Sequence, residues 1–119
     1  MNYFKKRIQA FGFALSGLFA AFKTESHLKI HALATAIVII AGIYFKITKA
    51  EWLAISICCG TVLAAELFNS AIEKLCDIIS PQLNPKIKFI KDVSAGAVLV
   101  LALMSLVVAF LIFSSKILL

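Results

Sequence analysis

The sequence predicts an all-α integral membrane protein with one domain over residues 1–119, in which an N-terminal amphipathic surface helix precedes three transmembrane helices. Hydrophobic residues make up 62% of the chain, against about 45–50% in typical soluble proteins. Long segments without charged residues recur along the chain, and most lysines and arginines lie at one end of these segments. Together these observations exclude a soluble globular domain.

The first predicted helix covers residues 3–23 and is amphipathic. Its apolar positions recur at the helical step, and polar residues occupy the opposite side. A helix of this kind is expected to lie flat on the cytoplasmic leaflet, with its basic residues toward the lipid headgroups. The alternative is a signal peptide, since Lys5, Lys6 and Arg7 precede an apolar stretch. The one-sided polarity and the absence of a clear cleavage motif after Phe22 favour the surface helix.

Three further helices, over residues 26–45, 49–79 and 85–115, are expected to contain the membrane spans. The first has 20 residues, about 30 Å at 1.5 Å per residue, which matches the hydrocarbon core of a bilayer. The second is longer than the bilayer requires, so its C-terminal third should reach beyond the hydrocarbon. In the third, Val93 to Ser115 has no charged residue.

Local motifs mark where these helices begin. Ser26 is a candidate N-cap for the first span. Thr48 and Glu51 have the spacing of a capping box at the start of the second. Asn84 and Pro85 read as a cap and a first helical residue for the third.

The net charge of +6 reflects membrane topology and not a nucleic-acid partner. Nine of the 12 lysines and arginines precede the first span or lie between the second and third spans. The positive-inside rule therefore places the N-terminus and the loop after the second span in the cytoplasm. We expect a multi-pass membrane protein with its polar site on the cytoplasmic side.

Polar residues interrupt the second span at helical spacing. Glu66, Asn69, Ser70, Glu73 and Asp77 fall within an arc of roughly 100° at about 100° per residue. Carboxylates in a membrane-spanning helix are costly, and they normally face a protein or water interior and serve a function. Such an acidic stripe requires a counter-charge, most simply a divalent cation.

The expected topology brings other polar residues to the same face, namely Glu25 and the adjacent Lys91 and Asp92. Hard oxygen donors suit Mg²⁺, which prefers one or two carboxylates together with phosphate oxygens. A lysine that neutralises phosphate and a carboxylate that acts as base complete what phosphoryl transfer needs. The pattern alone leaves two alternatives, a proton-coupled transporter that uses Glu66 and a small accessory subunit.

Two segments resemble the signature of the prokaryotic diacylglycerol kinase family. They are residues 66–73 (ELFNSAIE), followed by Asp77, and residues 91–99 (KDVSAGAVL). Ala20, Ala21 and Phe22 with Glu25 extend the resemblance over essentially the whole chain. The resemblance implies an integral-membrane homotrimer in the bacterial inner membrane, with active sites shared between neighbouring subunits. It also implies transfer of the γ-phosphoryl group of ATP, as its Mg²⁺ complex, to the hydroxyl of a membrane lipid.

The resemblance also implies a role for each site residue. Glu66 matches the catalytic base, and Asn69 matches the amide that orients the catalytic site. Glu25 and Glu73 match carboxylates that bind the metal and, through it, ATP. The remaining nucleotide-contacting positions are Asp77, Lys91 and Asp92.

The resemblance indicates two possible acceptor lipids. Family members phosphorylate either diacylglycerol, giving phosphatidic acid, or undecaprenol, giving undecaprenyl phosphate. The segment from Glu25 to His31 resembles the undecaprenol branch. Diacylglycerol, however, gives the family its name. We therefore expect diacylglycerol as the acceptor lipid, with undecaprenol as the alternative. His27 and His31 are expected to be interfacial residues and not ligands. Cys58, Cys59 and Cys76 are expected to act as small apolar side chains.

Overall fold

The computed structural model describes residues 2–82 and 84–118 and is entirely helical in its regular structure. Four helices follow one another: α1 (Tyr3–Thr24), α2 (Ser26–Tyr44), α3 (Lys49–Ile79) and α4 (Pro85–Ile117). These bounds agree with the expected ones to within two residues. Three of the four helices, α2, α3 and α4, are long and apolar enough to cross a membrane. The predicted all-α membrane architecture is therefore confirmed.

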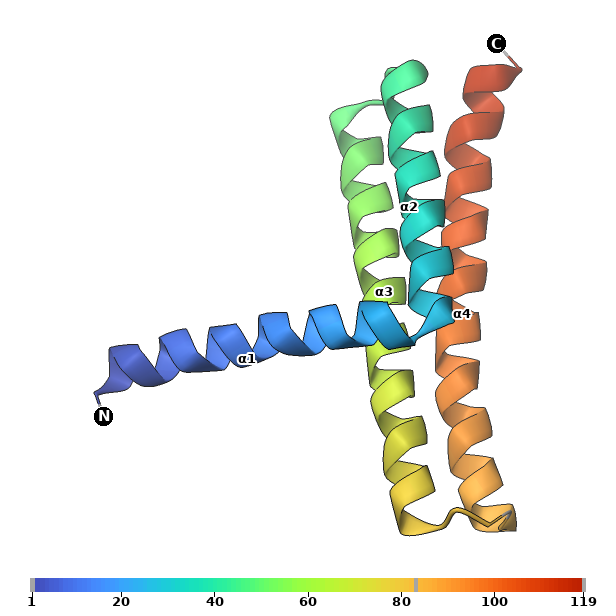
Figure 1. The fold of residues 1–119 in the computed structure, drawn as a ribbon. Coiled ribbons are helices and arrows are strands. Elements are labelled where there is room, and N and C mark those ends of the chain that lie inside the picture. Colours follow the sequence, from blue (N-terminus) through green and yellow to red (C-terminus); the bar gives the residue numbers. More distant parts are fainter. Residues whose placement is uncertain (1, 83, 119) are drawn as a thin grey trace.

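The three apolar helices stand side by side, and α1 extends sideways from them (Figure 1). The most extensive packing joins α3 to α4, followed by α2 against α3. Below the level of α1 in Figure 1, only α3 and α4 continue, and the loop after Ile79 joins them there. With 31 residues, α3 is about 46 Å long at 1.5 Å per residue, which exceeds the bilayer core of about 30 Å.

Capping motifs explain where α3 and α4 begin. Thr48 accepts a hydrogen bond from the backbone N–H of Glu51, and the Glu51 carboxylate accepts one from the backbone N–H of Thr48. At α4, the Asn84 side chain accepts from the backbone N–H of Lys86, and Pro85 is the first helical residue. Both predicted caps are confirmed.

The predicted cap of α2 is wrong. Ser26 is the first residue of the helix, and the N-cap position belongs to Glu25, whose side chain makes no capping hydrogen bond. The backbone N–H of Glu25 still bonds to the carbonyl of Ala21, the last turn of α1, so only one residue separates the two helices. The Glu25 carboxylate is consequently free to reach away from its own helix.

The hydrophobic core is concentrated at the end of the bundle where α2 turns into α3. Ile47, Ile55 and Ile112 are buried there, and residues from all three spans pack around them. The large apolar side chains of α2 and α4 that point away from this core are mostly exposed, as for Ile40 at 67% and Phe110 at 70%. A surface of this kind is expected where hydrocarbon, and not water, surrounds the helices.

The α2–α3 turn is compact and tightly packed. Lys46 adopts a left-handed backbone conformation with φ of 52°, which reverses the chain between the two helices. Beside it, Gly42 is buried against the Trp52 ring, and a Cβ atom at Gly42 would lie 2.6 Å from Cη2 of Trp52. Close contact between the two helices at this end therefore depends on the missing side chain.

We expect Gly42→Ala to destabilise the protein by about 1–3 kcal/mol, because the added methyl group forces the Trp52 ring to move within a packed cluster. The free energy of unfolding in mixed micelles measures the effect. Gly12→Ala is the matched control, since a Cβ atom there meets no atom within 4 Å. Equal stability of the two variants would contradict the proposed packing.

Candidate active site

The polar stripe of α3 begins with two residues that point into the protein. Glu66 is 5% exposed and Asn69 is 8% exposed, and they are the buried polar or charged residues among those that the structure describes. Glu66 lies 17 residues after Lys49, or about 26 Å along the helix, close to the inner edge of a bilayer core of about 30 Å. Glu66 and Asn69 therefore face protein, whereas Asp77 at the far end of the stripe is exposed.

The buried carboxylate of Glu66 has a partner on α2. Nε2 of His31 lies 2.9 Å from Oε1 of Glu66. The His31 side chain is 26% exposed and that of Glu66 is 7% exposed, so the contact is largely shielded. A buried carboxylate without a polar partner would be costly. The contact thus accounts for how α3 tolerates a charge at this depth.

Asn69 connects the buried part of the stripe to the more exposed Glu73. Its Nδ2 donates a hydrogen bond of 3.3 Å to Oε1 of Glu73, one helical turn further on. Its Oδ1 is buried and has no hydrogen-bond partner among the described residues. Buried polar atoms are normally satisfied, so this oxygen identifies a place where a further donor or a cation is needed.

Glu25 meets α3 from the α1–α2 junction. Its carboxylate lies 3.1 Å from Nζ of Lys74, the residue after Glu73. A pocket of about 400 Å³ lies beside this pair, between the end of α1 and α3. Mostly small residues line it, including Gly17, Ala20, Ser70 and Ala71, in addition to Glu25 and Lys74.

The remaining sequence-predicted site residues lie where α3 and α4 extend beyond α1. Nζ of Lys91 donates a hydrogen bond of 2.6 Å to Oδ1 of Asp77, which ties α4 to α3. The Asp92 carboxylate is exposed and bonds instead to Lys88 on its own helix, four residues earlier. The adjacent Lys91 and Asp92 therefore have different partners, although the sequence groups them together.

The acidic residues do not form a ready-made metal cage. Among residues 2–82 and 84–118, no group of three or more His, Cys, Asp or Glu side chains is close enough to hold a metal ion. The sequence expectation of several carboxylates gathered on one cation is therefore not met by one chain. The donors that are present still suit Mg²⁺, which takes one or two carboxylates and completes its shell with water and phosphate oxygens. Glu73 and the unsatisfied Oδ1 of Asn69 are hard oxygen donors of this kind.

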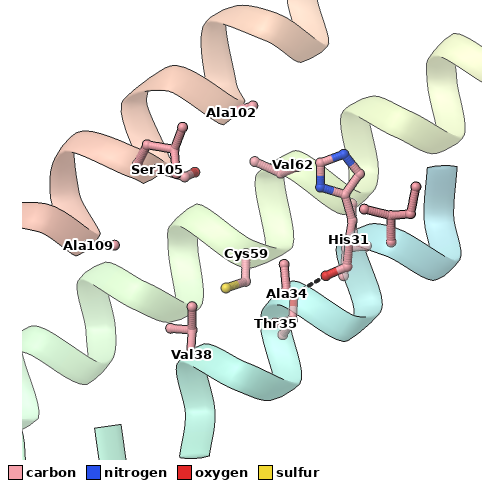
Figure 2. Close-up of a pocket in the computed structure, with 12 residues that line it drawn as sticks. His31, Ala34, Thr35, Val38, Cys59, Val62, Ala102, Ser105 and Ala109 are labelled. Carbon is pink, nitrogen blue, oxygen red and sulfur yellow. Dashed lines mark hydrogen bonds between the residues drawn. The ribbon is translucent and has the colours of Figure 1, made fainter. Parts of the chain in front are cut away.

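A mostly apolar crevice of about 270 Å³ begins at His31 and runs between the three spans (Figure 2). In Figure 2, His31 and Thr35 come from α2, Cys59 and Val62 from α3, and Ser105 faces them from α4. Thr35 donates a hydrogen bond to the backbone carbonyl of His31. The crevice therefore leads from the apolar interior of the bundle to His31, the residue that contacts Glu66.

His31 is the site residue that sequence reasoning missed. The sequence analysis expected an interfacial residue there, whereas the side chain contacts the buried carboxylate. A signal was available, because His31 and Glu66 occupy similar expected depths on antiparallel spans. A buried carboxylate also requires a polar partner. His27, by contrast, is exposed.

Together, the fold and the site define a small helical membrane protein with a polar cluster at the bilayer boundary. Residues 12–113 match the family described as prokaryotic diacylglycerol kinase. The chain therefore belongs to the prokaryotic diacylglycerol kinase family, and it is a phosphotransferase.

Individual relatives carry two different substrate names. The chain is 34% identical over 115 residues to an undecaprenol kinase of Bacillus subtilis (strain 168), which covers 97% of this chain and 94% of that protein. It is 30% identical over 93 residues to a diacylglycerol kinase of Pseudomonas aeruginosa, with 78% and 76% covered. A diacylglycerol kinase of Synechocystis sp. is also 30% identical, over 83% of this chain and 57% of that protein.

Proposed function

We propose that this protein is an ATP-dependent lipid kinase that phosphorylates the hydroxyl of a membrane lipid at the cytoplasmic face of the bacterial inner membrane. The observation that carries the proposal is the burial of Glu66 beside His31, at the depth where a lipid hydroxyl would lie. The nine basic residues on one side of the spans support the cytoplasmic orientation of the N-terminus and the site.

In the proposed reaction, Glu66 is the general base. The lipid hydroxyl oxygen attacks the γ-phosphorus of ATP, the bond to the β–γ bridging oxygen breaks, and ADP leaves. The hydroxyl proton passes to the Glu66 carboxylate. Asn69 orients the site through its bond to Glu73. Positioning of the two substrates and neutralisation of phosphate charge supply most of the remaining catalysis.

The nucleotide is proposed to bind where α3 and α4 extend beyond α1. Lys91, which now pairs with Asp77, supplies a cation for phosphate, and Asp92 is a further contact on the same turn. Glu25 and Glu73 would hold Mg²⁺, which would neutralise phosphate charge on ATP. Within one chain Glu25 is paired with Lys74, so ATP binding would exchange that contact for others.

We further propose that the protein acts as a homotrimer with shared sites. Two features of the single chain support assembly: its extensive exposed apolar surface and the buried, unpartnered Oδ1 of Asn69 among the described residues. A neighbouring subunit would cover part of the exposed apolar surface and supply a polar partner for Oδ1 of Asn69.

For the acceptor lipid we favour undecaprenol over diacylglycerol, which reverses the order that the sequence suggested. The undecaprenol kinase of Bacillus subtilis aligns with nearly the whole of both chains. Diacylglycerol is the second candidate, since the other two relatives carry that name.

Purified protein given radiolabelled ATP should phosphorylate undecaprenol faster than diacylglycerol when both are offered at equal mole fraction in mixed micelles. Product separation by thin-layer chromatography measures both rates in one reaction. A higher rate on diacylglycerol would reverse the assignment of the acceptor. Labelling of neither lipid would refute the kinase itself and favour a transporter or an accessory subunit.

Glu66→Gln should lower kcat by about 10²–10⁴-fold, because the variant keeps the shape of the side chain but cannot accept the hydroxyl proton. Binding of MgATP, measured by calorimetry, should change little, since the proposed nucleotide contacts are elsewhere. Glu51→Gln is the matched control, as Glu51 pairs with Lys116 at the opposite end of the bundle. Full activity of Glu66→Gln would exclude its role as base.

Glu73→Gln should raise the Mg²⁺ concentration needed for half-maximal activity by at least about 10-fold, because it removes one proposed carboxylate ligand. A magnesium titration at fixed ATP measures the shift, again with Glu51→Gln as control. An unchanged magnesium dependence would argue against Glu73 as a metal ligand.

A further inference from the structure

The contact between His31 and Glu66 joins two helices at a buried point. His31 lies six positions after Glu25 in the sequence, and Glu66 lies 35 positions after His31. The antiparallel packing of α2 on α3 brings the two side chains to 2.9 Å between Nε2 and Oε1. At this distance a protonated imidazole would form an ion pair with the Glu66 carboxylate.

The contact joins His31 to one carboxylate oxygen of Glu66, Oε1. Along α3, Asn69 directs its amide to Glu73 and not to Glu66. Along α2, the Thr35 hydroxyl bonds to the backbone of His31 and not to its ring. His31 is thus the side chain of α2 in polar contact with the Glu66 carboxylate.

From this geometry we propose that His31 is a positioning residue for Glu66. The imidazole holds Oε1, so that Oε2 faces the place where the lipid hydroxyl arrives. His31 also lines the apolar crevice, so the hydroxyl of a lipid whose chain enters there would reach the oriented carboxylate. This inference rests on the proposed role of Glu66 as base.

The role is one of orientation and not of nucleotide binding. The proposed nucleotide-binding residues pair with Lys74, Asn69, Asp77 and Lys88, and none of these contacts involves His31. A change at His31 should therefore act on kcat and leave KM for MgATP nearly unchanged. Misplacement of a catalytic group by about 1 Å can lower a rate by about 10²-fold.

A set of four variants tests the proposal. His31→Gln can place its amide nitrogen where Nε2 lies, whereas His31→Asn is one methylene shorter and cannot reach Oε1. His31→Leu fills a similar volume without a donor. His27→Leu is the matched control, since His27 is exposed and one turn earlier on the same helix.

We expect kcat to fall by about 10–100-fold in His31→Leu and His31→Asn, and to stay within about fivefold of the parent in His31→Gln and His27→Leu. KM for MgATP should remain within about threefold in all four. Adding His31→Leu to Glu66→Gln should cause no further loss, because His31 acts through Glu66. Thermal stability in detergent identifies any variant that fails to fold, and the comparison of His31→Gln with His31→Asn stands even if His31→Leu is lost.

Several results would overturn the proposal. These are parental kcat in His31→Leu, equal losses in His31→Gln and His31→Asn, a change confined to KM, or additive losses in the double variant. Each would leave the kinase assignment intact, provided that the parent protein phosphorylates a lipid and Glu66→Gln does not. A parent without activity on either lipid would instead refute the proposed function.

Discussion

The structure depends on one constraint: a carboxylate has to be buried among helices that are long and apolar enough to span a membrane. Glu66 meets this constraint through its position and its neighbour. It lies near the end of the hydrocarbon, where burial costs less than at the bilayer centre. His31 supplies a polar contact from the adjacent helix. Under the proposed function, the lipid and the nucleotide meet at this carboxylate.

The unequal helix lengths separate two chemical environments. Within the bundle, α2, α3 and α4 together enclose an apolar crevice (Figure 2). Beyond α1, only α3 and α4 continue (Figure 1), and there Lys91 of α4 pairs with Asp77 of α3. Exposed pairs of this kind are weakly held and can be exchanged for contacts with a ligand. Glu66 and Asn69 occupy the boundary between the two environments.

Local signals made most of the fold predictable. The capping box at Thr48, the Asn84 cap and the charge-free third span each depend on residues close in sequence, and the structure has all three. The inward orientation of Glu66 and Asn69 followed from helical periodicity. Contacts between helices could not be predicted from such local signals. The partners of Glu66 and Glu25 depend on how far one helix slides past another, and side-chain packing decides that register.

The tight turn between α2 and α3 has a consequence for a region far from it. His31 lies 14 residues before Phe45, and Glu66 lies 18 residues after Thr48. The conformation of this turn therefore sets how the two side chains are aligned along their helices. The left-handed Lys46 and the Gly42–Trp52 packing fix the starting point of both helices. One inserted residue would rotate the following helix by about 100° and shift it by about 1.5 Å relative to its neighbour. Loops at membrane surfaces usually tolerate such length changes, but the length of this turn determines which residues of α2 and α3 meet at the opposite end of the bundle. Relatives that keep the His–Glu pair should therefore keep the length of this turn too.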